Sequence, residues 1–173
     1  MIVVDTNVIC YLFLPSQHKS LIDNLLRYDP DWVAPQLWIS EFRNALTGYL
    51  RHQIIPFEEA LPIMAQAESF FHGRIFKVDS SQVLKLVNQS SCSAYDCEFV
   101  ALAQYLHVPL LTFDKKILRE FPDTAVSPEE LCGNISEPTV FIGNGLETYG
   151  EFLDRRLGPW FIDRSKAKRH TVA

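Results

Sequence analysis

Five short, mostly apolar runs recur along the first 132 residues, and longer segments with helical spacing separate them. Residues 2–4 are all apolar and β-branched, which is typical of a strand buried on both faces of a parallel sheet. The pattern predicts strands at 2–4, 32–34, 75–78, 108–112 and 124–126, the last at an edge of the sheet.

Between these runs, apolar residues recur three or four positions apart, as they do on the buried face of a helix. In residues 18–28 this face consists of Leu21, Ile22, Leu25 and Leu26. Pro35 can occupy the first position of a helix, so we expect the next helix to open there and to continue to Arg51. The predicted helices are 7–14, 18–28, 35–51, 57–71, 80–89, 94–107 and a short one after Asp114.

Strands that alternate with helices form right-handed crossovers and a parallel sheet covered on both faces. The expected fold class is therefore α/β, a three-layer α/β/α sandwich around a four- to five-stranded, mainly parallel sheet. In such a sheet, ligands bind beyond the carboxyl ends of the strands, where the strand order reverses.

The composition narrows the class of protein. With 47% hydrophobic and 21% charged residues, the chain of 173 residues is typical of one ordinary soluble domain. It has neither a run of roughly 20 apolar residues, as a membrane span needs, nor the basic start of a secretory signal. No Cys-x-x-Cys pair occurs among the four cysteines, so we expect reduced thiols in a cytoplasmic protein.

The charge limits how nucleic acid could bind. The formal net charge is −5, which argues against a surface that attracts phosphates everywhere. Residues 1–132 hold 10 basic and 16 acidic residues, net −6, and residues 133–173 hold 6 basic and 5 acidic, net +1. Any binding of nucleic acid is therefore expected to be local.

Two acids follow predicted strands directly. Asp5 ends the first strand, and Asp114 follows the fourth in Leu110-Leu-Thr-Phe-Asp. Each also has a purely structural interpretation, because Asp5 can form an Asx-turn and Asp114 can cap the next helix.

Two further acids lie on helices in the phase of the apolar face. Asp96 stands one turn before Phe99 and Val100, although Ser93 and Asp96 also resemble a capping box. Glu41 lies one turn after Trp38, where an unpaired acid is costly. The structural alternative is a buried ion pair between Glu41 and a base such as Arg43 or Arg51.

One bound divalent ion accounts for the four acids together. Clustered carboxylates repel one another, and Mg²⁺ or Mn²⁺, which prefer oxygen ligands, relieves that repulsion. Zinc fits less well, because the cysteines and histidines show no ligand spacing. One or two hard ions suit phosphodiester hydrolysis, since they activate water and stabilise the attacking and leaving oxygens. Asn7 and Thr112 add amide and hydroxyl groups at the same edge.

These residues resemble a PIN domain over about residues 1–132. The four acidic blocks occur in the order of that family: Val4-Asp-Thr-Asn-Val, Ser40-Glu-Phe-Arg-Asn-Ala, Tyr95-Asp with Val100-Ala-Leu-Ala, and Leu111-Thr-Phe-Asp-Lys. The VapC-like ribonuclease toxins of type II toxin-antitoxin modules are the most similar members.

The resemblance implies a Mg²⁺- or Mn²⁺-dependent endoribonuclease that acts on RNA, forms a homodimer and is inhibited by a small antitoxin protein. It also implies a role for each acid and for three neighbours. By this resemblance the principal metal ligands are Asp5 and Asp96, the acids that complete the catalytic site are Glu41 and Asp114, and the supporting residues are Thr6, Asn7 and Thr112.

The chain departs from the family pattern after residue 132. We expect a nuclease domain at 1–132 and a C-terminal extension at 133–173 that packs on the domain or on a second subunit. The extension contains a candidate helix with Leu146, Tyr149, Leu153 and Leu157 on one face. Its basic tail, 164–173, either contacts RNA phosphates or is a solvated terminus.

Two alternatives belong to other functional classes. A PIN-like module could bind RNA or protein as a regulator without turnover. A receiver-like phosphoacceptor would use Asp5, Asp79, Thr112 and Lys115 at strand ends, but it lacks an adjacent acid pair and leaves Glu41 unexplained.

Overall fold

The computed structural model describes residues 1–134, 139–141 and 161–163. The chain divides into two compact units, Met1–Glu130 and Leu131–Ala173. The first unit contains the sheet and all the acids singled out above, so it is the unit that positions the candidate site.

A five-stranded parallel sheet forms the centre of the first unit, in the order β3-β2-β1-β4-β5. Its central strand β1 is buried throughout and pairs with β2 on one side and β4 on the other. The strands span Ile2–Val4 (β1), Trp32–Pro35 (β2), Ile75–Phe76 (β3), Leu110–Leu111 (β4) and Ala125–Val126 (β5). Because the chain builds outward from β1 to β3 and then returns to place β4 beside β1, the strand order reverses between β1 and β4.

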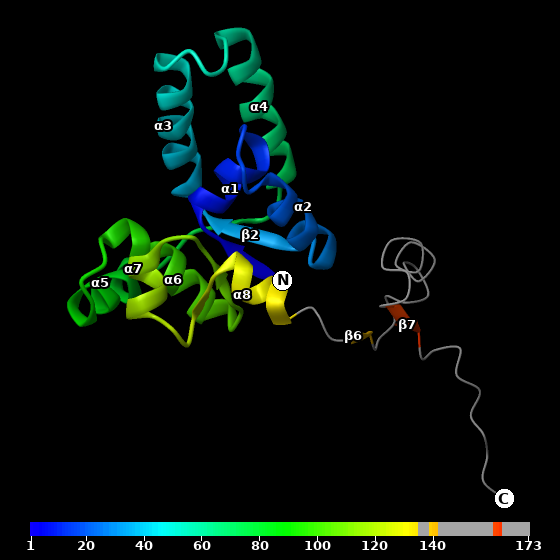
Figure 1. Ribbon diagram of the computed structural model, residues 1–173. Helices are drawn as coiled ribbons and strands as arrows, with labels where there is room; N and C mark the ends of the chain where they lie inside the picture. The colour runs from blue at the N-terminus through cyan, green and yellow to red at the C-terminus, as the bar shows by residue number, and fades with distance from the viewer. Residues whose placement is uncertain (135–138, 142–160, 164–173) are drawn as a thin grey trace, which may run out of the picture. The chain divides into compact units, whose positions relative to one another are not determined.

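Helices cover both faces of this sheet, which confirms the predicted three-layer α/β class. Figure 1 shows α1 to α4 gathered on one side of β1 and β2, with α5 to α7 on the other. The helices span Thr6–Phe13 (α1), Lys19–Tyr28 (α2), Trp38–Arg51 (α3), Phe57–Phe70 (α4), Ser80–Gln89 (α5), Ala94–Leu106 (α6), Lys115–Glu120 (α7) and Pro128–Asn134 (α8).

The helix start predicted at Pro35 is wrong. Pro35 does not open a helix but is the last residue of β2, and α3 begins at Trp38. The backbone N–H groups of Ala34 and Gln36, on either side of Pro35, donate to carbonyls of the β3 segment. Proline therefore fits between them, since this ladder requires no N–H from that position.

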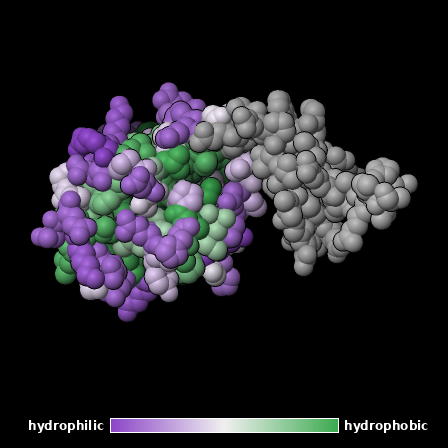
Figure 2. All heavy atoms as spheres, turned by 90° about the horizontal axis from the view of Figure 1, so that it is seen from below, coloured by the Kyte–Doolittle hydropathy of each residue, from purple (hydrophilic) through white to green (hydrophobic). Residues whose placement is uncertain are grey.

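The core consists of large side chains from both helical layers and the sheet. Trp32, Trp38, Phe42, Phe71 and Phe99 are all fully buried. On the face shown in Figure 2, hydrophilic residues surround separate patches of hydrophobic ones. Within the residues that the structure describes, no helix is long and apolar enough to cross a membrane.

In the second unit, β6 (Thr139–Phe141) pairs in parallel with β7 (Phe161–Asp163). The candidate helix around Leu146–Leu157 and the basic tail 164–173 lie outside the described residues.

Candidate active site

Asp5 stands where the strand order reverses, immediately after β1. Its backbone N–H donates to the carbonyl of Leu111 at 3.0 Å, which extends the pairing of β1 with β4 by one residue. Asp5 is 8% exposed. It occupies the N-cap position of α1, yet its carboxylate makes no capping hydrogen bond to that helix. The carboxylate is therefore not explained by helix capping.

Neutral groups from α1 and the end of β4 hold the Asp5 carboxylate. The Thr112 hydroxyl and the Asn7 amide nitrogen both donate to its Oδ2, each at 2.6 Å. Thr112, which is fully buried, also accepts from the Asn7 amide at 3.2 Å and from the Asp114 backbone N–H at 2.9 Å. Because Thr112 and Asn7 each make several of these bonds, the position of Asp5 is set by both segments together.

Burial makes the ionised form of Asp5 unfavourable. Desolvation raises its pKa from 3.8 to about 6, and the charges of Glu41 and Asp114 add to the effect. The hydrogen bond from Thr112 opposes the shift. Asp5 is thus a buried carboxylate with acidic neighbours, an arrangement in which a nearby cation would strongly favour the ionised form.

Glu41 faces the same site from the first turn of α3. The Thr6 hydroxyl donates to its Oε2 at 2.6 Å. Partial burial raises the pKa of Glu41, the Thr6 bond opposes this, and the charge of Asp96 adds to the increase.

The structural alternative of an ion pair for Glu41 fails with both candidate bases of α3. Arg43 instead approaches Glu68 of α4 at 3.5 Å. Arg51 ends α3 ten residues after Glu41, about 15 Å along the helix axis.

Asp96 caps the N-terminus of α6 as part of a capping box with Ser93. Its Oδ2 accepts from the Ser93 backbone N–H at 2.9 Å, while the Ser93 hydroxyl accepts from the Asp96 N–H at 3.1 Å. The capping interpretation is therefore correct for Asp96. Asp96 is also an electrostatic neighbour of Glu41, as its effect on the pKa of that residue shows.

Asp114 is the N-cap of α7, as the structural interpretation of that residue predicted. Its Oδ1 accepts from the backbone N–H groups of Lys116 at 2.7 Å and of Ile117 at 3.3 Å. Both bonds go to one oxygen, and the charge of Asp114 raises the pKa of Asp5. Capping and membership of the acidic site are thus compatible for this residue.

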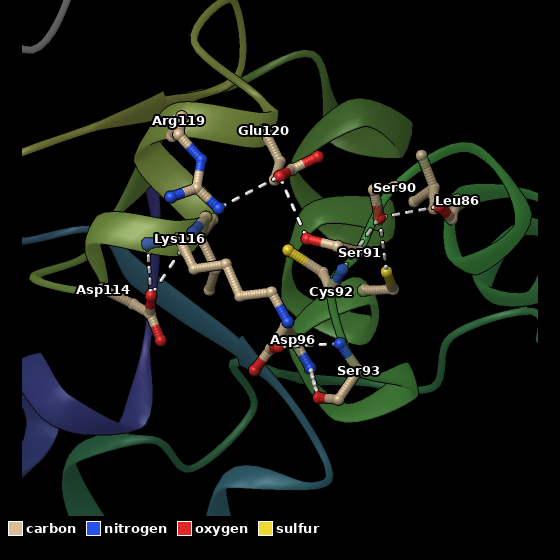
Figure 3. A network of polar contacts seen from close by, with 12 residues as sticks. Leu86, Ser90, Ser91, Cys92, Ser93, Asp96, Asp114, Lys116, Arg119 and Glu120 are labelled. Carbon is tan, nitrogen blue, oxygen red and sulfur yellow. Dashed lines mark hydrogen bonds and ion pairs between the residues drawn. The ribbon is translucent and has the colours of Figure 1, made fainter.

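Figure 3 shows α7 beside the N-terminus of α6, with the Lys116 side chain extending toward Asp96 and Cys92. The Ser91 hydroxyl donates to Glu120 at 3.0 Å and so connects α7 with the segment before α6. Burial raises the pKa of Cys92, and the charge of Lys116 partly offsets this increase. Lys116 is thus a cation close to the acids.

The acids do not form a closed set of metal ligands. Among the described residues, no three Asp, Glu, His or Cys side chains lie close enough together to hold an ion by themselves. Asp96 and Asp114 each direct one oxygen to a helix N-terminus, which leaves the second oxygen of each carboxylate outside these capping bonds.

The donor groups nevertheless fit a hard cation. They are carboxylate, hydroxyl and amide oxygens, and the hydrogen bonds to the Asp5 carboxylate come from neutral groups. Mg²⁺ is often held by one or two carboxylates with water in its remaining positions. Asp5 with one of its acidic neighbours would satisfy that requirement.

Glu98, which the sequence pattern does not single out, also belongs to this acidic region. Burial raises its pKa, and the charge of Glu41 contributes. Glu98 lies on α6 and Glu41 on α3, so no local spacing in the sequence relates the two.

The PIN domain family matches residues 2–123, a segment that contains all four predicted acids. The chain belongs to this family. The resemblance that the four acidic blocks carried is thereby confirmed.

Known proteins also resemble the chain in sequence and in fold. Ribonuclease VapC3 of Pyrobaculum aerophilum is 27% identical over 126 residues, which cover 70% of this chain and 95% of the relative. The crystal structure of PAE2754 from P. aerophilum has a TM-score of 0.62 at 19% identity and covers 77% of this chain and 94% of that one. A toxin-antitoxin complex from Klebsiella pneumoniae has a TM-score of 0.56 at 17% identity, with coverages of 74% and 98%. The likeness to the two structures establishes the fold.

Proposed function

We propose that this PIN protein is a Mg²⁺- or Mn²⁺-dependent endoribonuclease that hydrolyses RNA phosphodiester bonds and is the toxin of a type II toxin-antitoxin module. Its similarity to Ribonuclease VapC3 supports the nuclease activity, and its structural likeness to a toxin-antitoxin complex supports the toxin role.

The buried carboxylate of Asp5 is the observation that carries the proposal. It lies at the point of strand reversal, where ligands bind in open α/β sheets, and its pKa is raised to about 6. Perturbed carboxylates clustered at such a position are typical of functional sites. The structural roles found for Asp96 and Asp114 do not extend to Asp5.

Each residue would have a distinct task. Asp5 and Asp96 would be the principal ligands of one or two ions, with Glu41 and Asp114 completing the site. When bound, the ion supplies positive charge for the phosphate oxygens and lowers the pKa of water. Thr112 and Asn7 orient Asp5, and Thr6 orients Glu41. The raised pKa of Glu41 suits a group that accepts a proton from the attacking water.

The proposal includes partners. A small antitoxin protein would inhibit the enzyme by occupying the acidic site, and two copies of the chain would form a homodimer. Because the substrate is cellular RNA, the proposed place of action is the cytoplasm.

The test is cleavage of end-labelled structured RNAs by the full chain with Mn²⁺, Mg²⁺ or a chelator. We expect cleavage only with an ion, and a loss of at least 100-fold in the variants Asp5→Asn and Asp96→Asn. The matched control is Asp79→Asn. Asp79 is exposed and caps α5 through the Ser81 N–H at 2.7 Å, a role that asparagine can also fill, so its variant should cleave like the parent.

The other outcomes separate the alternatives. If Asp5→Asn and Asp96→Asn both cleave RNA at the parental rate, the assignment of these acids to the active site is wrong. Tight RNA binding without turnover under any ion would instead favour the regulatory module. The family match and the capping role of Asp79 argue against the phosphoacceptor alternative.

A further inference from the structure

Three partly exposed aromatic rings lie against one another beside the acidic site. The Phe113 ring meets the Tyr11 ring edge to face, with centroids 4.9 Å apart. The His18 ring is 4.8 Å from Tyr11 and 4.7 Å from Phe113. We call these three residues the aromatic cluster.

The aromatic cluster is joined to the hydrogen bonds that hold Asp5. Phe113 lies between Thr112 and Asp114, and its backbone N–H donates to Asn7 Oδ1 at 3.2 Å. Tyr11 lies one turn after Asn7 on α1. Phe113 and Tyr11 therefore come from the same two segments that hold the Asp5 carboxylate.

The burial of the cluster differs from that of the core aromatics. Phe42 and Phe71 are fully buried, whereas the three residues of the cluster are only partly buried. Adjacent aromatic rings in partly exposed residues are candidates for stacking with a planar group.

The net negative charge of residues 1–132 favours an RNA-binding surface that does not depend on charge. Residues 1–132 carry 16 acidic and 10 basic residues, so long-range attraction contributes little to holding a polyanion. Stacking of bases on aromatic rings does not depend on net charge and tolerates any base. Lys115, which is exposed and follows Asp114, can still contact a phosphate locally.

We propose that the aromatic cluster of Tyr11, His18 and Phe113 is a base-binding subsite, on which a nucleobase of single-stranded RNA stacks next to the phosphate to be cleaved. This inference rests on the proposed ribonuclease function. Stacking on the aromatic cluster supplies affinity for RNA that the acidic surface of the domain does not provide.

The test measures binding and turnover separately in two variants of the full chain, Phe113→Leu and Tyr11→Leu. Leucine stays apolar and lacks a ring face. We expect KM for a single-stranded RNA to rise about tenfold in each variant, while kcat changes less than twofold. We also expect parental protein to quench the fluorescence of a 2-aminopurine base in that RNA, and both variants to lose most of this quenching.

The matched control is Phe13→Leu. Phe13 lies on the same helix α1 and is also half-buried, but its ring packs on Phe42 and Phe70, with centroids 6.2 and 5.9 Å away. This variant should keep the parental KM and quenching. The conservative variant Tyr11→Phe, which keeps the ring, should do the same.

The outcomes distinguish the subsite from the function on which it rests. Parental KM and quenching in Phe113→Leu and Tyr11→Leu would overturn the subsite while leaving the nuclease intact. An equal rise of KM in Phe13→Leu would overturn it as well, because the effect would then come from packing. If the parental protein neither cleaves nor binds RNA, the proposed function fails and the subsite fails with it.

Discussion

The buried charge of Asp5 should destabilise the metal-free protein at neutral pH, and removing that charge should stabilise it. The pKa of Asp5 is about 6 in the folded chain, against 3.8 for the unfolded reference. The folded state therefore binds the proton more tightly. Below pH 3.8 both states are protonated and no penalty arises; the penalty grows as the pH rises and is complete above about pH 6. A difference of two pKa units corresponds to about 3 kcal/mol.

The variant Asp5→Asn removes the charge and keeps the shape of the side chain. Its amide oxygen can still accept from the Thr112 hydroxyl and from Asn7, but its NH₂ group replaces an acceptor oxygen, which costs about 1 kcal/mol. We therefore expect the free energy of unfolding in a chelator at pH 7.5 to increase by about 2 kcal/mol relative to the parent. At pH 4 the gain should vanish or become a small loss.

The assay is urea unfolding of parent and variant at the two pH values. Asp79→Asn is the control of opposite sign, because hydrogen bonds from the Ser81 backbone and side chain lower the pKa of Asp79. Its carboxylate stabilises the fold above the unfolded pKa, so the variant should lose stability at pH 7.5 and little at low pH. Adding Mn²⁺ at pH 7.5 should stabilise the parent more than Asp5→Asn, since an ion that binds only the folded state raises its stability.

One result would refute the reasoning about Asp5. If Asp5→Asn lowers the free energy of unfolding at pH 7.5 as much as at pH 4, the carboxylate is not a buried, strained charge. A parental protein whose stability in chelator does not fall between pH 4 and pH 7.5 relative to the variant would lead to the same conclusion.

Three further predictions concern the support of the site and the core. Thr112→Val removes the hydroxyl that opposes the pKa shift of Asp5. The acidic limb of the pH–rate profile for RNA cleavage should therefore move upward by about one pH unit. An unchanged acidic limb would contradict the role of that hydrogen bond. Ser93→Ala should lower the free energy of unfolding by about 1 kcal/mol and also slow RNA cleavage, because Asp96 loses its capping box. The control Asp79→Ala loses a helix cap as well but should not slow cleavage. Equal cleavage rates in both variants would show that the Asp96 cap does not position the site. Leu111→Ala in the buried β4 should lower the free energy of unfolding, measured by chemical denaturation, by about 3 kcal/mol. A decrease below about 1 kcal/mol would mean that the strand is packed loosely.

The local pattern of the sequence was sufficient to predict the five strands of the main sheet, most of the helices and the α/β class. Each depends on the spacing of apolar residues within one segment, and a sheet buried on both faces requires apolar runs such as residues 2–4. Local pattern also placed Asp5 and Asp114 at strand ends and Asp96 in a capping box, positions that the structure reproduces. It placed Pro35 wrongly, because the fixed φ of proline suits the end of a strand as well as the start of a helix.

Only the tertiary structure decided which of these residues touch. The bond between Thr112 and Asp5 joins residues 107 positions apart, and it exists because β4 pairs beside β1. The bond between Thr6 and Glu41 and the electrostatic effect of Glu41 on Glu98 likewise join residues of different helices that are far apart in the sequence. Strand order also buries Asp5, and burial, which no local pattern measures, is the largest cause of its raised pKa. The sequence by itself thus determined which chemical groups reach the edge of the sheet, and long-range strand pairing determined their partners and their charge.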